Sequence, residues 1–252
     1  MASRQLRGVP VGGRVPGCGA ASLTGLAAAS DSGEHDLFLH DLDLGHQFVV
    51  GADEAGRGCL AGPIVAASVC FDRATLEDRG SGALDRLFDS KRLTEKRREA
   101  LYPAILESAR SVRVALRSAR YIDAEGIQKA NIGALTAAIL PTVGLDDAVR
   151  LVDGFSLGTT APRHSKLVKG DSLSATVAAA SIVAKVTRDA LMRSAAEIHP
   201  GYGFEGHKGY GSAAHREAIA KLGPCPIHRL SFRLTASPDD APVADDSGTR
   251  QA

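Results

Sequence analysis

The chain has 252 residues, of which 44% are hydrophobic and 23% charged, and its formal net charge is +1. This length suits one domain with tails, and the composition allows a sizeable buried core. The balance excludes the strongly basic signature of many nucleic-acid binders, and no apolar run reaches the roughly 18 residues of a membrane span. We therefore expect one globular domain without a membrane partner.

Charge is distributed unevenly along the chain. Residues 86–120 carry ten Lys/Arg against four Asp/Glu, a net charge of +6, and residues 163–221 carry nine against five, a net charge of +4. The segment from Ala236 holds four aspartates and one arginine, a net charge of −3. Basic segments with acidic ends fit a polyanion-binding face, although helix surfaces that have no partner look similar.

The two ends of the chain differ from its middle. Residues 1–36 are rich in Gly, Ala and Ser without periodicity, and 36–46 suit a short helix or turn. We predict a disordered or weakly ordered leader over 1–46, one domain over 47–235 and an acidic disordered tail over 236–252. Three arginines and no acidic residue within the first thirty positions also fit a weak targeting segment or a misplaced start.

The four cysteines stand at positions 18, 59, 70 and 225 without CxxC or metal-ligand spacing. Such cysteines indicate ordinary thiols in a reducing compartment, so we expect the protein in the cytoplasm.

The first strong signal is an apolar run, Phe48–Ala52, that ends on two adjacent carboxylates and a glycine-flanked arginine, Gly56-Arg57-Gly58. The run predicts a buried strand and the glycines predict a sharp turn. Two carboxylates at a strand end are costly unless they are neutralised, either by Arg or Lys or by a divalent cation.

Gly51–Gly58 is not a nucleotide P-loop, although its glycine spacing is close to one. That motif requires a lysine followed by serine or threonine, for the phosphates and for magnesium, and here arginine and glycine occupy those positions. Asp53 and Glu54 would also lie inside the cradle and repel a phosphate. A phosphate can come here only together with a metal.

The following elements alternate between strand and helix patterns. Residues 64–71 predict a second strand, antiparallel to the first, and Thr94 is a candidate N-cap of a helix. Residues 112–116 alternate apolar and polar side chains, which predicts a strand with one solvent-facing side, and 123–140 return to helical spacing before Pro141.

Two later strands repeat the design of a strand that ends on a carboxylate. Val149–Gly154 ends on Asp153, and Leu167–Asp171 ends on Asp171. A helix is predicted over Ser172–Glu197 and another over Ser212–Leu222. The whole pattern indicates an α/β protein with a mixed sheet covered by helices and no second domain.

Carboxylates at three strand ends predict a metal site, because such ends gather at one place in an open α/β sheet. Unshielded like charges would raise each other's pKa values, and hard oxygen ligands favour magnesium or manganese. Two such ions can carry out an in-line phosphoryl displacement. Adjacent strand residues face opposite sides, so Asp53 and Glu54 share a site only if the strand ends between them. Scattered aspartates that cap turns are the alternative.

Eight sequence blocks over residues 46–233 resemble the ribonuclease HII family, and they occur in the order seen in that family. The blocks are Asp53–Gly58, Gly62-Pro63, Asp89-Ser90-Lys91, Val152–Gly154, Lys169–Asp171, Ala179–Lys185 with Arg188-Asp189, His207–Gly211, and Pro226–Arg229 with Ser231-Phe232. The resemblance implies a ribonuclease H-like fold, a mixed sheet flanked by helices, with a helical C-terminal extension. It also implies hydrolysis of the RNA strand of RNA–DNA hybrids and incision 5′ to single ribonucleotides in duplex DNA.

The resemblance also implies roles for individual residues. The catalytic and metal-binding carboxylates, which would hold Mn or Mg and two ions during catalysis, would be Asp53, Glu54, Asp153 and Asp171. Gly56, Arg57 and Gly58 match the turn that contacts the ribose 2′-hydroxyl, the group that distinguishes RNA from DNA. Tyr210 matches a tyrosine that stacks on the neighbouring sugar, and its alternative is a half-buried core tyrosine.

Further substrate-binding residues are expected in the basic and small-residue blocks. Lys91, Lys185 and Arg188 are candidate phosphate contacts, and Ser181 is a candidate substrate contact. Each cation has the alternative of an ordinary surface charge or an internal ion pair, and the neighbouring Asp189 offers Arg188 such a pair.

The main hypothesis is a metal-dependent endoribonuclease that acts as a monomer and leaves 3′-hydroxyl and 5′-phosphate ends. Its alternatives are another two-metal DNA nuclease of the same fold, a non-catalytic hybrid-binding module, and a plain α/β domain with a structural ion-pair cluster. A DNA-only nuclease has no 2′-hydroxyl to inspect, so the Gly-Arg-Gly turn and Tyr210 argue against it. A binding module would be expected to lack a carboxylate, and all four are present.

Overall fold

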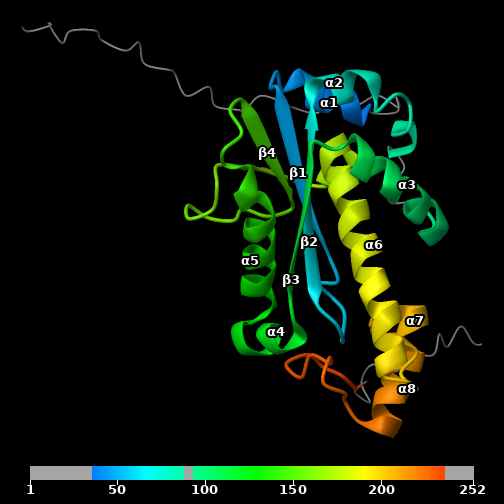
Figure 1. The fold of residues 1–252 in the computed structure, drawn as a ribbon. Coiled ribbons are helices and arrows are strands. Elements are labelled where there is room, and N and C mark those ends of the chain that lie inside the picture. The colour runs from blue at the N-terminus through cyan, green and yellow to red at the C-terminus, as the bar shows by residue number, and fades with distance from the viewer. Residues whose placement is uncertain (1–35, 88–92, 236–252) are drawn as a thin grey trace, which may run out of the picture. The chain divides into compact units, whose positions relative to one another are not determined.

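The computed structural model describes residues 36–87 and 93–235. Its sheet has five strands in the spatial order β3-β2-β1-β4-β5 (Figure 1). The strands are β1 (Phe48–Ala55), β2 (Ile64–Asp72), β3 (Ser111–Arg117), β4 (Ala148–Asp153) and β5 (Ser165–Leu167). β2 lies antiparallel to β1 and β3, whereas β4 lies parallel to β1 and β5. The mixed sheet and the antiparallel β1–β2 pair confirm the predictions.

Helices cover both faces of this sheet. They are α1 (Leu37–Asp43), α2 (Arg73–Asp78), α3 (Glu95–Ser108), α4 (Ala119–Glu125), α5 (Ile127–Ile139), α6 (Ala175–Ile198), α7 (Phe204–His207) and α8 (Ala213–Leu222). Short 3₁₀ turns, η2 (Leu140–Thr142) and η3 (Gly170–Ser172), follow α5 and precede α6. The long helix α6 packs on one face of β1 and β2, and α5 packs on the other face (Figure 1). No helix within the described ranges has the length and apolarity to cross a membrane.

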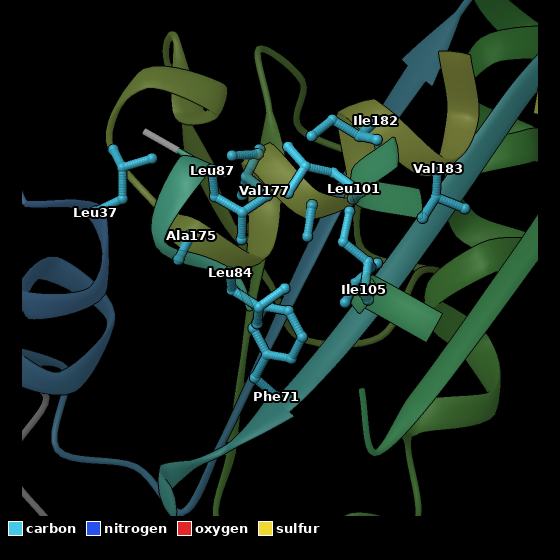
Figure 2. Packing of buried hydrophobic residues seen from close by; sticks show 14 of the residues in the cluster. Leu37, Phe71, Leu84, Leu87, Leu101, Ile105, Ala175, Val177, Ile182 and Val183 are labelled. Atoms are coloured by element: carbon cyan, nitrogen blue, oxygen red, sulfur yellow. The ribbon is translucent and has the colours of Figure 1, made fainter. Parts of the chain in front are cut away.

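The larger core cluster lies between the sheet and the helices α1, α3 and α6. Figure 2 shows Phe71 of β2 beside Leu84 and near Ile105 of α3, and Val177 and Val183 of α6 belong to the same cluster. Helix α6 approaches β1 closely because its buried face is rich in alanine. Gly51 of β1 meets the α6 backbone so closely that an added Cβ would lie 2.2 Å from the Thr176 carbonyl carbon.

Three predicted elements differ from the structure. The strand expected over Leu167–Asp171 is β5, which ends at Leu167, and Asp171 lies in the 3₁₀ turn η3 because Lys169 adopts a left-handed backbone (φ +57°). Helix α1 lies within the predicted leader 1–46, yet Leu37 and Phe38 are buried in the core, and Asp41 accepts hydrogen bonds from the Thr176 amide and hydroxyl. The packed domain therefore begins before residue 47. The predicted helix 123–140 is two helices, because Gly126 adopts a φ of +82° that interrupts the helical backbone.

Candidate active site

The two adjacent carboxylates of β1 point to opposite faces of the sheet. β1 continues through Ala55, so the break predicted between Asp53 and Glu54 does not occur. Asp53 lies beside Ser181 of α6, and Glu54 lies beside Asn131 of α5. Both residues are still paired with β2, but the pairing of β1 with β4 ends at Ala52, so the sheet is open on the β4 side of the two carboxylates. The charge of Asp53 raises the pKa of Glu54 across this open side.

Asp153 and Asp171 reach the same end of the sheet from neighbouring segments. β4 pairs in register with β1 up to Ala52 and Val152, which places Asp153 next to the level of Asp53. The Gly170 amide donates to Asp153 Oδ1 at 2.6 Å, so the turn that carries Asp171 is tied to the end of β4. Asp171 itself is buried in η3.

The charges of these carboxylates act on one another. Burial, and then the charges of Asp153 and Asp171, raise the pKa of Asp53 to about 7, while a hydrogen bond from Ser181 opposes the rise. Burial and the charges of Asp53 and Asp153 raise the pKa of Glu54 to about 8, and Arg57 opposes this rise. The site therefore holds carboxylates that cannot all ionise cheaply at neutral pH.

The residues present fit a divalent cation in their chemistry. Glu54 Oε2 is buried and accepts no hydrogen bond. A buried carboxylate oxygen without a partner is costly, and a hard cation such as magnesium or manganese would satisfy it. As the side chains stand, the described residues contain no group of three or more His, Cys, Asp or Glu that is arranged to hold a metal ion.

The Gly-Arg-Gly turn follows β1 directly, and its two glycines have different surroundings. Gly56 has a φ of +92°, and a Cβ there would lie 1.9 Å from Arg188 Nε, so the turn requires glycine for its own packing. Gly58 has nothing within 4 Å of an added Cβ. The missing side chain at Gly58 therefore leaves space open at the surface of the site.

The side chain of Arg57 extends from the turn along the α5 side of the site. Its Nη2 donates to Gln128 Oε1 at 2.9 Å, and its guanidinium lies over the Phe155 ring at 4.8 Å. Arg57 is exposed and lies near enough to lower the pKa of Glu54. The side chain is thus held in place by two uncharged partners, Gln128 and Phe155, which leave its positive charge in place.

Tyr210 borders the same turn from the loop between α7 and α8. Its side chain is 43% exposed, and its hydroxyl is within hydrogen-bonding reach of the buried Cys59 thiol. Lys185 Nζ lies 5.4 Å from the ring centroid, and Arg188 Cζ lies 5.7 Å from it. Two cations lie against a ring that is still 43% exposed, which suits a stacking surface better than a core position.

The basic side chains predicted to contact phosphate have different environments. Lys185 pairs with Asp189 at 2.6 Å but keeps 25% of its side chain exposed. Arg188 is fully buried and donates to the carbonyls of Pro63, Ala61 and Lys208. This burial is at odds with a direct phosphate contact by Arg188, and it also excludes the Arg188–Asp189 ion pair considered as its alternative. Lys91 lies outside the described residues.

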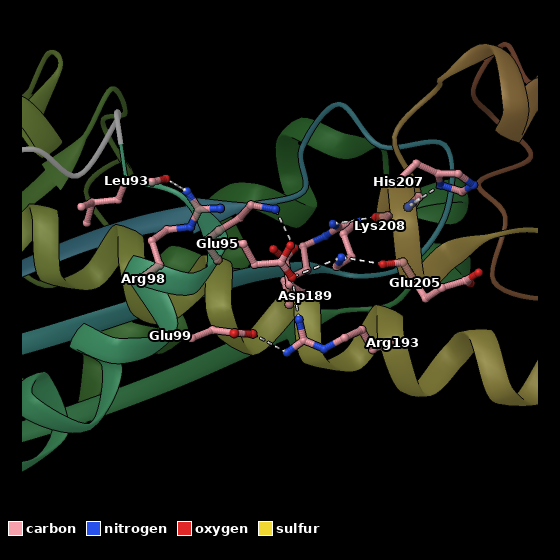
Figure 3. Close-up of polar contacts among 12 residues, drawn as sticks. Leu93, Glu95, Arg98, Glu99, Asp189, Arg193, Glu205, His207 and Lys208 are labelled. Atoms are coloured by element: carbon pink, nitrogen blue, oxygen red, sulfur yellow. Dashed lines mark hydrogen bonds and ion pairs between the residues drawn. The ribbon is translucent and has the colours of Figure 1, made fainter.

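Part of the positive charge of the basic segments is neutralised within the protein. Figure 3 shows Glu95 and Glu99 of α3 reaching Arg193 of α6 at 2.7 and 2.9 Å. Lys208 also reaches Glu95, at 3.2 Å. These contacts tie α3 to α6, and they leave Arg193 and Lys208 less available to a polyanion than unpaired cations.

Sequence reasoning did not single out Asn131 or Arg229 as site residues. Asn131 is fully buried beside Glu54. Neither its amide nitrogen nor its amide oxygen makes a hydrogen bond of normal geometry. The sequence could have indicated Asn131, because it is a polar residue among the apolar positions that form the buried face of α5. Arg229 is fully buried behind the Gly-Arg-Gly turn, and its partners are backbone atoms that no side-chain motif reveals.

Comparison with known proteins gives one consistent family. The family model described as ribonuclease HII matches residues 50–235. The ribonuclease HII of Rhizobium leguminosarum bv. trifolii is 45% identical over 204 residues, which span 80% of this chain and 85% of that protein. The ribonuclease HII of Brucella ovis is 50% identical over 191 residues, 75% of this chain and 83% of that protein.

Solved structures agree on the fold. The ribonuclease HII in a complex with PCNA from Archaeoglobus fulgidus aligns with a TM-score of 0.62 and 28% identity, over 77% of this chain and 99% of that one. The ribonuclease H2 of Pyrococcus horikoshii aligns with a TM-score of 0.61 and 24% identity, over 74% of this chain and 94% of that one. A Bst-RNase HIII in complex with Mn²⁺ aligns with a TM-score of 0.59 and 20% identity, over 84% of this chain and 76% of that one.

The motif order, the carboxylates at the ends of β1 and β4, and the extent of the family match lead to one assignment. The chain belongs to the ribonuclease HII family of ribonuclease H enzymes and has the ribonuclease H-like fold.

Proposed function

We propose that the protein hydrolyses the RNA strand of RNA–DNA hybrids and incises duplex DNA 5′ to single embedded ribonucleotides, leaving 3′-hydroxyl and 5′-phosphate ends. One observation supports this proposal above all. Buried carboxylates that raise each other's pKa values lie next to a turn in which Gly58 leaves open space. A backbone without a side chain can approach a ribose 2′-hydroxyl directly. The site thus combines a metal-binding group with a means of recognising RNA.

The metal requirement follows from the donor set. Asp53, Glu54, Asp153 and Asp171 would hold two divalent ions, Mn²⁺ or Mg²⁺. When bound, such ions activate water and stabilise the departing oxygen of a phosphodiester. Binding of a cation would lower the raised pKa values of these carboxylates towards their ordinary values, because the cation offsets their mutual repulsion.

The remaining side chains would position the substrate. The exposed face of Tyr210 offers a stacking surface for a sugar next to the ribonucleotide. Lys185 and Arg57 place positive charge on the two sides of the site, and we propose that Lys185 contacts a phosphate. Ser181 lies beside Asp53 and would orient that carboxylate as well as border the substrate.

The state and location of the protein are also proposals. We propose a monomer, which is supported by the distribution of the exposed large apolar side chains of the described residues over several elements, among them α1, α3, β3, α6 and α8. We propose the cytoplasm, which is supported by the free thiols of Cys59, Cys70 and Cys225. Sedimentation velocity and cell fractionation test these two points.

The decisive experiment uses a DNA duplex that carries one ribonucleotide, incubated with Mn²⁺, Mg²⁺ or EDTA. We expect a single incision 5′ to the ribonucleotide with either metal, none with EDTA, and none for Asp53→Asn. A matched all-DNA duplex is the control for recognition of the 2′-hydroxyl. Equal cutting of the all-DNA duplex would indicate a general nuclease, and binding without cutting would indicate a hybrid-binding module.

A further inference from the structure

The guanidinium of Arg229 donates hydrogen bonds to backbone carbonyls of the Gly-Arg-Gly turn from the buried side of the turn. It is fully buried. Its Nη2 donates to the Gly56 carbonyl at 2.7 Å, and its Nη1 donates to the Arg57 carbonyl at 2.9 Å. Nε and Nη2 both donate to the Gly62 carbonyl, at 3.0 and 2.9 Å. One guanidinium therefore fixes the beginning and the end of the segment that forms the turn.

The backbone around Arg229 is tied to the same segment. The Arg229 amide donates to the Leu60 carbonyl at 2.8 Å, and the Gly62 amide donates to the Ile227 carbonyl at 2.8 Å. Ala61 and His228 form an antiparallel bridge between these two hydrogen bonds. Residues 227–229, which we call the 227–229 strut, thus run alongside the end of the turn.

His228 extends the 227–229 strut to the loop of Tyr210. The Cys225 amide donates to His228 Nδ1 at 2.8 Å, a shorter contact than the 3.3 Å to the Cys225 carbonyl, so Nδ1 is the acceptor. His228 Nε2 then carries the proton and donates to His215 Nε2 at 3.1 Å. His215 in turn donates from Nδ1 to the Tyr210 carbonyl at 2.8 Å.

This chain of hydrogen bonds requires both histidines to be neutral. Burial lowers the pKa of His215 to about 4 and also lowers the pKa of His228, which agrees with that requirement. The rings are packed by Phe204, whose centroid lies 5.4 Å from His215 and 5.6 Å from His228. The hydrogen bonds from His228 through His215 to Tyr210 therefore form a buried connection between the two segments.

We propose that the 227–229 strut sets the Gly-Arg-Gly turn and Tyr210 at a fixed separation, and that Arg229 and His228 are positioning residues for ribonucleotide recognition. The proposal rests on the proposed function, because it assigns to the turn and to Tyr210 the two contacts with the ribonucleotide. Neither residue would touch the substrate, since both are buried. Arg229 reaches the three carbonyls from three different nitrogens of one planar group. The three donors of a lysine ammonium all leave a single nitrogen and cannot span the same positions.

The test compares Arg229→Lys with Arg150→Lys. Arg150 is also buried and donates to Thr142, but it lies in the half of β4 away from Asp153. Both variants, made in an Asp53→Asn background with magnesium, are titrated with a duplex carrying one ribonucleotide and with the matched all-DNA duplex. We expect Arg229→Lys to lower the ratio of the two affinities at least tenfold and Arg150→Lys to leave it unchanged.

Amide hydrogen exchange provides a readout that does not depend on the reaction. We expect Arg229→Lys to accelerate exchange in residues 56–62 selectively. If Arg229→Lys does not fold, His228→Phe replaces it, because it keeps the ring packing and removes both nitrogens; faster exchange is then expected at 209–211.

The two readouts separate failure of the strut from failure of the proposed function. Unchanged exchange in these segments, or an unchanged affinity ratio in a variant of a ribonucleotide-selective protein, would overturn the positioning role. Faster exchange in a protein whose wild type does not distinguish the two duplexes would overturn the ribonucleotide role alone.

Discussion

At the scale of single residues, the two glycines of the turn after β1 differ in their surroundings. Gly56 has a left-handed backbone and is packed against Arg188, whereas Gly58 has open space where a side chain would be. Both occur in the same short motif and are indistinguishable in the sequence. Only the first is explained by the packing of the protein itself, and the proposed close approach of a ribose is the role that we assign to the second.

Substitution of each glycine by alanine should therefore give opposite results. We expect Gly56→Ala to destabilise the fold by about 2–4 kcal/mol, from backbone strain and steric overlap with Arg188. Gly58→Ala should change stability by less than about 0.5 kcal/mol and still reduce kcat/KM on a single-ribonucleotide duplex by about tenfold or more. Urea unfolding and initial rates measure the two effects. Full activity of Gly58→Ala would contradict a close approach of substrate to this position.

A second prediction at this scale concerns Asp53 in metal-free protein. Its ordinary pKa near 4 rises to about 7 in the folded protein, so the folded state holds a proton that the unfolded chain releases. Stability from this group is fully present below pH 4 and is lost as the pH rises through 7. We expect Asp53→Asn in EDTA to raise Tm at pH 8 by about 5 °C and to raise it by less than half as much at pH 5, where the folded protein still holds the proton.

The comparison of wild type with Asp53→Asn isolates this group from others, such as His215, that titrate at lower pH. Differential scanning fluorimetry at the two pH values is sufficient. A variant that is less stable than wild type at pH 8 in EDTA would show that Asp53 is compensated by other charges. Added Mg²⁺ should stabilise wild type more than Asp53→Asn.

At the scale of elements, the site depends on the close approach of α6 to β1. The alanine-rich face of α6 allows its backbone to reach Gly51, and this contact brings Ser181 and Lys185 to the end of β1. Helix α1 contributes from outside the predicted domain, since Asp41 accepts hydrogen bonds from the first turn of α6. The position of α6 therefore connects the core with the site.

Gly51→Ala tests this contact. The added methyl group would lie 2.2 Å from the Thr176 carbonyl carbon and the Val177 nitrogen, both backbone atoms that cannot rotate away. We expect a loss of about 3 kcal/mol in the free energy of unfolding, measured by urea denaturation. Gly144→Ala, at a position with nothing within 4 Å, is the matched control and should be nearly neutral. Equal stabilities of the two variants would mean that α6 shifts without cost.

At the scale of the whole molecule, charge pairing decides which cations can face a substrate. The net charge of +1 is the sum of two basic segments and of acidic residues elsewhere. In the structure, Arg193 of α6 and Lys208, which follows α7, form ion pairs with glutamates of α3. Lys185, partly exposed next to Tyr210, is in a better position to meet phosphate.

Salt dependence distinguishes these two kinds of cation. Binding to a ribonucleotide-containing duplex should weaken as salt rises, and Lys185→Met should reduce the slope of log K against log salt by about one. Arg193→Met removes the same charge from a position neutralised by Glu95 and Glu99, so its slope should stay near the wild-type value. Fluorescence anisotropy at several salt concentrations measures both. Identical slopes for the two variants would argue against a phosphate contact by Lys185.

The sequence by itself determined the elements and the chemistry. Periodicity located β1, β2, β3 and the long helix α6, and the carboxylates after apolar runs indicated a cation site, because these signals are local and depend on neighbouring residue types. The motif order fixed the family, which the comparisons confirm. The positions of Asp53 and Glu54 at a strand end were also evident before their geometry was known.

Only the tertiary structure decided which residues that are distant in the sequence lie together and which of them are buried. It showed that Asp53 and Glu54 reach the site from opposite faces, that Arg188 is buried and not free to meet phosphate, and that α1 belongs to the core. It also revealed Arg229 behind the turn, 173 positions from Gly56 in the chain. The physical reason is that a guanidinium can either face solvent or satisfy buried carbonyls. The difference depends on which segments pack around it, which no local pattern records.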